Sequence, residues 1–365
     1  MADDIAENLE RGATVESSQP RPSRSNMLST GCTLLNLACT GNAFGGFLKG
    51  QYYLIVGDST SGKTFLSMSC LAEATLNRRF ADYRFIYDNV EDGCHIDLEG
   101  LFNKAVAERI EPPVEMDDGL PLYSSTVEEF YYNVDDAIAD GRPFIYILDS
   151  MDGLSSDPEG DKFDEDKKAF RKGIDAKGSY GDGKAKHNST HLRTVLRGLR
   201  DSGSILIIIA QTRDNLGFGA KFTPKTRSGG RSLRFYANTE IWSSVKGQIT
   251  KTVKGKLRPV GVRVKLDVKK NRMTGVTPVV ETSIYPSHGI DDVGTCVDYL
   301  IDEGWWTKKK QSIDAREFEM VAARGKIIQH IEENGLLNNL RALVGKCWKE
   351  IEDASALKRK NRYTQ

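Results

Sequence analysis

Residues 52–64 read YYLIVGDSTSGKT, and this stretch decides the expected fold. The apolar run at 52–56 is typical of a strand that is buried on both faces of a parallel sheet. The next eight residues, 57–64, fit the pattern G-x-x-x-x-G-K-[ST], in which backbone N–H groups and a helix N-terminus surround phosphate oxygens. A helical stretch at 63–76 follows directly. Strand, glycine-containing loop and helix therefore stand in the order that a phosphate-binding loop requires.

Single residues of this loop have expected roles. Lys63 is expected to reach the β- and γ-phosphates of ATP, and the Thr64 hydroxyl is expected to bind Mg²⁺. The whole loop forms the candidate ATP site: Gly57, Asp58, Ser59, Thr60, Ser61, Gly62, Lys63 and Thr64.

The rest of the chain repeats the pattern of buried strands and helices. Apolar runs at 85–87, 144–148 and 204–210 predict three more strands, and 191–200 has a helical pattern. This alternation indicates an α/β fold with a mostly parallel central sheet covered by helices on both faces. Segments 239–246, 260–269 and 279–285 are alternating or β-branched, so we expect a more antiparallel edge there. The expected domains are a short N-terminal helix and flexible arm at 1–28, a P-loop ATPase core at 29–290 and a small helical C-terminal region at 291–365.

Acidic residues that follow the strands are candidates for the chemistry of hydrolysis. Asp149 follows the strand at 144–148, where a carboxylate can orient the water shell of Mg²⁺. Glu91 is the preferred base, because it lies about where a strand-end loop would turn back over the γ-phosphate. The other candidates for the base are Asp88, Asp92 and Glu99.

Gln211 follows the apolar run at 205–210, and a lone amide at the end of a buried strand suits a γ-phosphate sensor. A loop at 212–228 follows that is basic and carries Phe218 and Phe222. Basic residues with aromatic neighbours are what binding to a single-stranded nucleic-acid backbone requires. A second long segment, 157–186, is rich in Gly, Asp and Lys, and a loop of that length is either functional or disordered.

The charge of the chain is unevenly distributed. Its formal net charge is zero, with 51 Lys plus Arg and 51 Asp plus Glu. Residues 81–140, however, contain 16 acidic and 3 basic residues, whereas residues 246–272 contain 10 basic residues and one acid. Such asymmetry can mark contact with nucleic acid, and an attraction between the two regions within an oligomer is the alternative.

Length and composition exclude several classes of protein. The chain has 365 residues, of which 39% are hydrophobic and 28% charged, as in an ordinary globular protein and unlike a disordered or fibrous one. The N-terminus carries no secretory signal, and the longest strongly apolar run is too short to span a membrane. The six cysteines form no C-x-x-C pair, so they are expected to be reduced thiols of a cytoplasmic protein.

The chain resembles a known family, the RecA-type recombinases, and especially the bacteriophage RecA-like recombinases of the UvsX type. The resemblance covers roughly residues 27–305, in the same order as in the family. Besides the phosphate loop, the matching segments are MLSTG (27–31), LLNLA (34–38), GG (45–46), KG (49–50), DSMDGL (149–154), GGRSLRFYA (229–237), KNR (270–272) and GID (289–291).

The resemblance implies a RecA-like core and a filament-forming, DNA-dependent ATPase that performs homologous pairing and strand exchange. Lys270 and Arg272 would reach the γ-phosphate bound by a neighbouring subunit, and Gln211 would couple that phosphate to the second DNA loop. The two DNA loops would lie at 155–188 and 212–230. The implied DNA-binding residues are Arg213, Lys221, Lys225, Arg227, Gly229, Gly230 and Arg231.

The implied partners are single-stranded and double-stranded DNA and further copies of the chain, with mediator and single-strand-binding proteins as further candidates. The implied location is the cytoplasm, which is that of the bacterial host if a phage encodes the protein. Two alternatives share the phosphate loop: a hexameric RecA-fold DNA helicase or translocase, and a RecA-fold regulatory ATPase that acts as a scaffold. The basic loop after Gln211 disfavours the scaffold.

Overall fold

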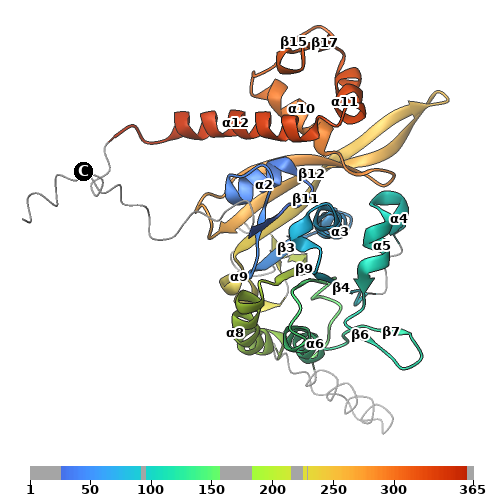
Figure 1. Ribbon diagram of the computed structural model, residues 1–365, viewed down its shortest axis with the longest axis vertical. Coiled ribbons are helices and arrows are strands. Elements are labelled where there is room, and N and C mark those ends of the chain that lie inside the picture. Colours follow the sequence, from blue (N-terminus) through green and yellow to red (C-terminus); the bar gives the residue numbers. More distant parts are fainter. Residues whose placement is uncertain (1–25, 92–95, 157–182, 215–224, 228, 360–365) are drawn as a thin grey trace, which may run out of the picture.

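A ten-stranded sheet forms the centre of the molecule (Figure 1). The computed structural model describes residues 26–91, 96–156, 183–214, 225–227 and 229–359. The strands lie in the order β14-β13-β12-β11-β3-β9-β8-β4-β5, and β10 pairs only with β9. Pairing is parallel from β11 to β5 and antiparallel from β11 to β14. The strands are β3 (Tyr52–Gly57), β4 (Arg84–Asp88), β5 (Ile110–Glu111), β8 (Phe144–Leu148), β9 (Ile205–Asp214), β10 (Lys225–Arg227), β11 (Thr239–Val253), β12 (Lys256–Asn271), β13 (Val279–Tyr285) and β14 (Gly289–Ile290).

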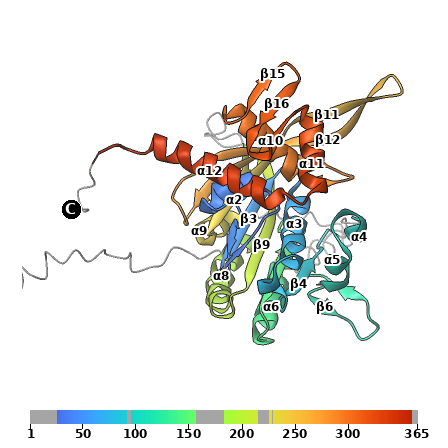
Figure 2. The ribbon, with the colours of Figure 1, turned by 45° about the horizontal axis from the view of Figure 1, so that its top comes forward.

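Helices cover both faces of this sheet, as the apolar strand pattern predicts (Figures 1 and 2). Side chains of β3 alternate between two apolar clusters, so Tyr53 and Ile55 pack on one side and Tyr52 and Leu54 on the other. The first face is covered by α2 (Thr33–Thr40), α3 (Lys63–Thr75), α5 (Lys104–Arg109), α10 (Asp292–Asp302), α11 (Arg324–Glu333) and α12 (Leu337–Ser355). The second face is covered by α6 (Val127–Ala139), α8 (Gly183–Ser202) and α9 (Gly230–Tyr236).

Two smaller hairpins lie outside the central sheet. Strands β1 (Met27–Leu28) and β2 (Phe47–Leu48) form one antiparallel pair beside α2. Strands β6 (Val114–Glu115) and β7 (Pro121–Leu122) form the other, which follows the short helix α4 (Leu98–Leu101) and α5 in the chain.

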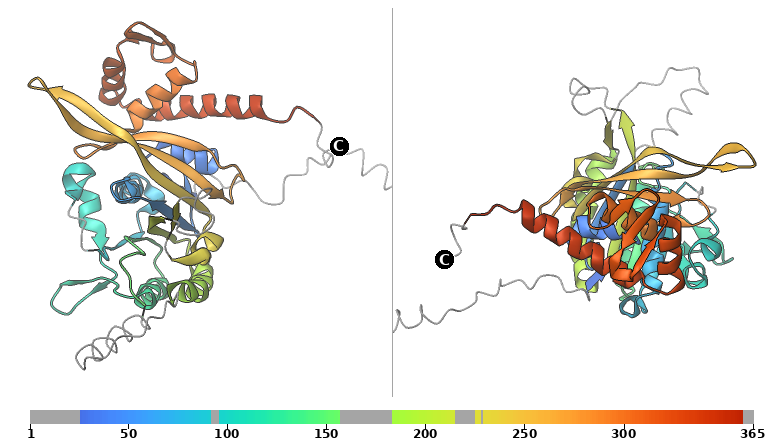
Figure 3. Two further views of the ribbon diagram at one scale, coloured as in Figure 1. Left: turned by 180° about the vertical axis from the view of Figure 1, so that it is seen from behind. Right: turned by 90° about the horizontal axis from the view of Figure 1, so that it is seen from above.

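The antiparallel edge is longer than the sequence indicates. Strands β11 and β12 pair over their whole length and form a hairpin whose end, residues 250–259, is exposed (Figure 3). The expected strands at 239–246 and 260–269 are the part of this hairpin that belongs to the sheet. The outer part has no core on either face, so it lacks the apolar alternation by which strands are predicted.

The C-terminal region contains strands as well as helices. After α10 the chain forms a three-stranded antiparallel sheet, β15 (Thr307–Lys309), β16 (Ser312–Ala315) and β17 (Met320–Ala322), before α11 and α12. The expectation of helices alone for 291–365 was therefore wrong. Strands of three or four residues are too short to show a clear alternation of apolar and polar side chains. The expected N-terminal helix and arm lie, up to residue 25, outside the described residues.

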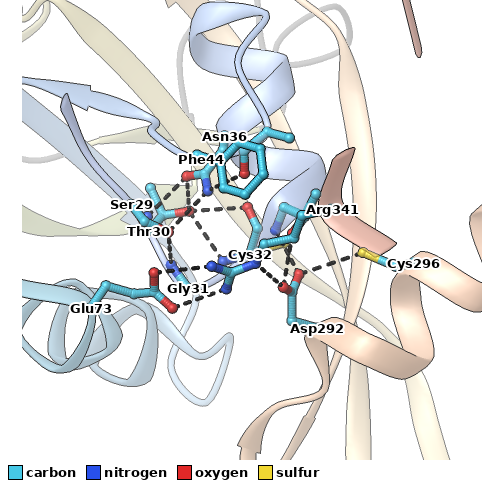
Figure 4. Close-up of polar contacts among 12 residues, drawn as sticks. Ser29, Thr30, Gly31, Cys32, Asn36, Phe44, Glu73, Asp292, Cys296 and Arg341 are labelled. Carbon is cyan, nitrogen blue, oxygen red and sulfur yellow. Dashed lines mark hydrogen bonds and ion pairs between the residues drawn. The ribbon is translucent and has the colours of Figure 1, made fainter. Parts of the chain in front are cut away.

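Helix α12 is attached to the core by buried charges (Figure 4). Arg341 of α12 donates to Asp292 at 3.1 Å and to Glu73 of α3 at 3.0 Å. Asp292 also accepts from the backbone and hydroxyl of Thr33, at 2.6 and 2.8 Å. Burial raises the pKa of Asp292, and Arg341 opposes that rise. One cation thus joins the C-terminal helix to the helix that follows the phosphate loop.

Replacing this cation should strongly destabilise the fold. We expect Arg341→Ala to lower the free energy of unfolding by about 3 kcal/mol or more, because Asp292 and Glu73 lose their compensating charge. The measurement is denaturant unfolding, with Lys349→Ala on the exposed side of the same helix as the control. Since Asp292 in the variant takes up a proton more readily, the difference in free energy of unfolding between the variant and the wild type should shrink as the pH falls from 7 to 5. An equal, small loss in both variants would contradict this role.

Five of the cysteines lie in the described part of the chain, and all five are free and buried, as expected for reduced thiols: Cys32, Cys39, Cys70, Cys296 and Cys347. Cys94 lies outside it. Among the described residues, no helix is both long and apolar enough to cross a membrane.

Candidate functional site

The carboxyl ends of the parallel strands form one edge of the sheet, and the candidate site lies there. Parallel register places Gly57, the last residue of β3, beside Gln211 of β9, and Asp88 of β4 beside Leu148 of β8. A cleft of about 450 Å³ opens next to this edge. Its lining comprises Thr60, Ser61, Gly62, Lys63, Thr64, Phe65, Asn89, Glu91, Ile96, Asp149, Gly261, Val262, Ile284 and Pro286.

The phosphate loop has the backbone that its sequence predicts. Gly62 has φ 83°, a left-handed conformation that favours glycine, and it directly precedes α3. A Cβ at Gly57 would strike the backbone oxygen of Ser243, so the loop also needs glycine at its start. Lys63 Nζ donates to the carbonyl oxygen of Asp58 at 2.7 Å, across the loop. Burial lowers the pKa of Lys63, and nearby carboxylates, Asp149 first, oppose that shift.

Thr64 and Asp149 meet, as expected for two residues that serve one metal ion. Thr64 Oγ1 donates to Asp149 Oδ2 at 2.7 Å, and the Tyr87 hydroxyl donates to the same oxygen at 3.1 Å. Burial raises the pKa of Asp149, so a cation beside it would be favoured. Within the described residues, no three His, Cys, Asp or Glu side chains cluster as a metal site. One hydroxyl and one carboxylate fit Mg²⁺, which keeps several waters and takes phosphate oxygens as further ligands.

The structure separates the candidate bases. Glu91 lines the cleft, where its Oε1 accepts from the Ser150 hydroxyl at 2.6 Å and from Gln211 Nε2 at 3.0 Å. Asp88 is buried, and its carboxylate accepts from Ser124 and from the Tyr146 hydroxyl. Glu99 lies on α4 and does not line the cleft. Asp92 lies outside the described residues.

Gln211 lies at the junction of the cleft and the expected second DNA loop. Its backbone N–H donates to Asp152 at 2.6 Å, while its side chain bonds Glu91. Strand β9 does not end here, as the sequence suggested, but continues to Asp214, because β10 pairs with its last three residues. The start and end of this loop therefore form a two-stranded ribbon that leads directly away from the cleft.

The ribbon also contacts the phosphate loop. Asp58 accepts from the Thr212 hydroxyl and pairs with Lys225, and these contacts lower the pKa of Asp58. Lys225, an expected DNA contact, is thus bound to a residue of the phosphate loop. Arg213 lies 3.6 Å from Asp152, with 61% of its side chain exposed.

Arg227, an expected DNA contact, is bound to an acidic residue of the core sheet. Its side chain is 12% exposed and lies 3.2 Å from Glu240 of β11, which is fully buried and also lies 3.1 Å from Arg234. A buried carboxylate needs compensating cations, so Arg227 stabilises Glu240 here, and its role as a DNA contact stays a prediction. Arg231 is exposed and lines a hollow with Arg234. Lys221 lies outside the described residues.

The two glycines of the GG segment shape the start of α9. Gly229 has φ 78° and Gly230 has φ 79°, and a Cβ at Gly229 would strike Leu233. The carbonyl of Gly229 accepts from Asn188 of α8 at 3.0 Å, and Asn188 in turn accepts from the Tyr131 hydroxyl at 2.7 Å. The ends of both expected DNA loops are therefore joined through Asn188; the first loop itself, from 157 to 182, lies outside the described residues.

Lys270 and Arg272 do not line the cleft of their own chain. Lys270 Nζ donates to the carbonyl oxygens of Arg234 and Phe235, at 2.6 and 2.8 Å, and Arg272 donates to that of Phe235 at 2.6 Å. Both cations thus lie at the C-terminal end of α9, where helix carbonyls favour positive charge. Burial lowers the pKa of Lys270 to about 8, and Arg272 adds to that shift.

Sequence reasoning missed four residues of the site: Tyr87, Ser150, Asp152 and Asn188. Asp152 had a signal, since it lies three residues after Asp149 at the same strand end. Ser150 and Tyr87 act through contacts between strands that are far apart in the sequence. Asn188 gave no signal, because an asparagine in a helical stretch is unremarkable by itself.

Known proteins of one family are similar to this chain. The family model described as the RecA N-terminal domain matches residues 173–291. The RecA protein of Cytophaga hutchinsonii is 28% identical over 284 residues, which cover 76% of this chain and 69% of the relative. The RecA protein of Thermus thermophilus is 25% identical, over 93% of this chain and 91% of its own. That of Clostridioides difficile is 24% identical, over 90% of this chain and 85% of its own. With the parallel core sheet and its phosphate loop, these matches support the RecA family for this chain, through its similarity to the bacterial RecA proteins.

Proposed function

We propose that the protein is an ATP-dependent recombinase that assembles as a filament on single-stranded DNA and promotes homologous pairing and strand exchange in recombination and repair. The observation that carries this proposal is the bond of 3.0 Å between Gln211 and Glu91. It joins the nucleotide cleft to the base of a basic loop, so that one side chain can report the state of the nucleotide to bound DNA. The names of the relatives support recombination as the purpose of this coupling.

ATP and Mg²⁺ fit the residues of the cleft. The N–H groups of residues 57–64 and Lys63 suit the phosphates of ATP. Val262, Ile284 and Pro286 offer an apolar wall for its adenine ring. Thr64 and Asp149 would hold Mg²⁺, which when bound neutralises charge that develops on the phosphates. Glu91 would accept the proton of the attacking water, and Ser150 and Gln211 orient its carboxylate.

The site is proposed to be completed by a neighbouring copy. Lys270 and Arg272 are held away from their own cleft by the carbonyls of α9, yet Arg272 is exposed. In a filament they would reach the γ-phosphate of the adjacent subunit and stabilise its charge during hydrolysis. DNA would lie along the loops at 155–188 and 212–230, with Arg213, Lys221, Arg227 and Arg231 as contacts. Lys225 could join them after leaving Asp58, and Gly229 and Gly230 would shape the loop end.

Removing the amide that couples the two sites should separate nucleotide binding from the response to DNA. We expect Gln211→Ala to bind ATP normally but to lose about tenfold or more of the stimulation of hydrolysis by single-stranded DNA. Steady-state ATPase rates with and without DNA measure this, with the exposed Gln329→Ala as the control. Full stimulation in Gln211→Ala would exclude the coupling role.

The lowered pKa of Lys270 predicts a pH dependence. Lys270 is a cation below its pKa of about 8 and becomes neutral as the pH rises through that value. If its charge supports hydrolysis, the DNA-stimulated rate should fall between pH 7 and 9. Lys270→Arg keeps its charge over this range and should flatten the profile. Superimposable profiles of the two proteins would show that the charge of Lys270 is not used.

We further propose that the protein belongs with the bacteriophage RecA-like recombinases, on the strength of the segments quoted from residues 27–305. Its location would be the bacterial cytoplasm, that of the host if a phage encodes it. Double-stranded DNA would be the second substrate, and mediator and single-strand-binding proteins would assist loading.

The proposal is tested by the ATPase rate with and without single-stranded DNA, together with electron microscopy of the mixture. We expect stimulated hydrolysis and extended filaments on the DNA. Closed rings that unwind a forked duplex would indicate a hexameric helicase instead. Slow hydrolysis that DNA does not change, without filaments, would indicate a regulatory scaffold.

A further inference from the structure

The β11–β12 hairpin carries a high density of positive charge, and the cations at its exposed end lack counter-ions among the described residues. Residues 241–266 contain seven Lys or Arg and no Asp or Glu. The end of this hairpin, residues 250–259, projects from the molecule (Figures 1 and 3). Its cations form no ion pair with another described residue, and they are Lys251, Lys254, Lys256 and Arg258. We call residues 250–259 the basic hairpin.

This charge lies on one face of the ribbon and is unfavourable in the isolated chain. Lys251 is directly opposite Arg258, and Lys256 is directly opposite Val253 on the same face. Like charges in directly opposite positions destabilise a sheet. Lys254 has φ 50°, where Asn, Asp or Gly would be less strained. The opposite face carries no charge, with Thr252 paired to Leu257. Such an arrangement indicates that a negatively charged partner covers the basic hairpin.

A second exposed hairpin has the opposite charge. Residues 114–122, formed by β6, β7 and their turn, are all exposed, and we call them the acidic hairpin. Glu115, Asp117 and Asp118 form no ion pair with another described residue. No Lys or Arg occurs between Arg109 and Arg142. The acidic hairpin therefore lacks cations in its own part of the chain.

Both hairpins also expose apolar side chains. In the acidic hairpin, Val114 lies opposite Leu122, and the hydrogen bond from Met116 N to Leu120 O places these two residues opposite each other as well. The four apolar side chains therefore share one face of the hairpin. Their exposed fractions are 37% for Val114, 39% for Met116, 55% for Leu120 and 49% for Leu122. In the basic hairpin, Leu257 is 73% exposed. Apolar patches rimmed by charge are typical of protein–protein contacts.

The position of the two hairpins suits a contact between copies. Both project from the same flank of the molecule, and they are separated along its long axis (Figures 1 and 2). Copies that are offset along that axis bring the basic hairpin of one toward the acidic hairpin of the next. Such a contact joins two different surfaces, which is the kind of interface that builds an open filament.

We propose that the acidic hairpin of one copy of this chain docks against the basic hairpin of the neighbouring copy. This contact rests on the proposed filament and adds an interface outside the nucleotide site. A DNA backbone would also match the charge of the basic hairpin. It would leave the acidic hairpin without a partner, whereas a second copy supplies an oppositely charged partner for each hairpin, so the observations favour a second copy.

Charge reversal on the two hairpins tests the proposal. The variants are Lys251→Glu with Lys256→Glu, Glu115→Lys with Asp117→Lys, and the combination of all four. The readout is the protein concentration at which half of the chains sediment as assemblies, with ATP, on single-stranded DNA and without DNA. Each reversal alone should raise this half-assembly concentration by about tenfold. The combination should return it to the wild-type value, because the two hairpins again carry opposite charges. The control, Lys308→Glu with Lys309→Glu, reverses two exposed cations of β15 and should change little.

Other outcomes overturn the proposal. Assembly unchanged in both single reversals, or no recovery in the combination, would exclude the hairpin contact. Weakened binding to duplex DNA in the Lys251→Glu, Lys256→Glu variant, again without recovery, would assign the basic hairpin to DNA. Wild-type protein that self-associates without DNA but forms no filament on DNA would contradict the proposed function. In that case the same variants and their control still test the hairpin contact by sedimentation without DNA. Unfolding midpoints equal to that of wild type verify that the variants are folded.

Discussion

Lys63→Ala should abolish nucleotide binding, and with it hydrolysis and the assembly on DNA of this variant by itself. Lys63 is nearly buried, and its ammonium group lies over the phosphate loop, 2.7 Å from the carbonyl oxygen of Asp58. Loss of a charge-assisted bond to two phosphates from such a site should weaken ATP binding by about 100-fold or more. Equilibrium titration with a fluorescent ATP analogue measures this directly.

The matched control is Lys104→Ala, since Lys104 is exposed and, among the residues that the structure describes, pairs with Glu108 on its own helix. Its ATP affinity should equal that of wild type. Lys63→Ala should also keep the unfolding midpoint of the wild-type protein, because the Lys63 side chain makes a single hydrogen bond with the described residues. Wild-type ATP affinity in Lys63→Ala would exclude residues 57–64 as the phosphate site.

Arg272→Ala should leave ATP binding unchanged but lower the rate of hydrolysis by about 1,000-fold, which is the effect of a cation that stabilises phosphoryl transfer. Arg272 does not line the cleft of its own chain, so its removal leaves the residues that hold the nucleotide intact. Single-turnover hydrolysis and nucleotide titration separate the two effects. Normal turnover in Arg272→Ala would refute its role at the phosphate.

Mixing two inactive variants tests whether Arg272 acts on a neighbouring copy. In an equal mixture of Arg272→Ala and Lys63→Ala, about a quarter of randomly formed interfaces combine an intact phosphate loop with an intact Arg272. The mixture should therefore regain up to about a quarter of the wild-type rate, although each variant alone is nearly inactive. A rate no higher than the sum of the separate variants would show that Arg272 does not act between copies.

The parts of this site that depend on local sequence could be predicted. The phosphate loop is one continuous segment whose conformation follows from its glycines, and Asp149 follows a strand that its apolar run identifies. Thr64 and Asp149 meet because parallel strands carry their carboxyl ends to one edge, which the α/β pattern already implies.

Contacts between distant segments could not be predicted in the same way. Gln211 and Glu91 are 120 positions apart, and their bond depends on the strand order, which no periodicity reveals. The contact of Arg227 with Glu240 could not be predicted, because composition does not distinguish an exposed cation from one that neutralises a buried acid. Glu240 was the available signal, since an acid within an apolar strand needs a cation nearby. The charge of the basic hairpin is visible in the sequence, but its strands were missed because neither of their faces meets the core.

Strand exchange between defined oligonucleotides tests the central claim most directly. Wild-type protein is assembled with ATP on a single strand, a labelled duplex is added, and transfer of the labelled strand is followed with time. We expect transfer from a homologous duplex, none from a heterologous duplex, and none with Lys63→Ala. Separation of both duplexes at the same rate, or transfer from neither while ATP is hydrolysed, would contradict the assignment as a recombinase.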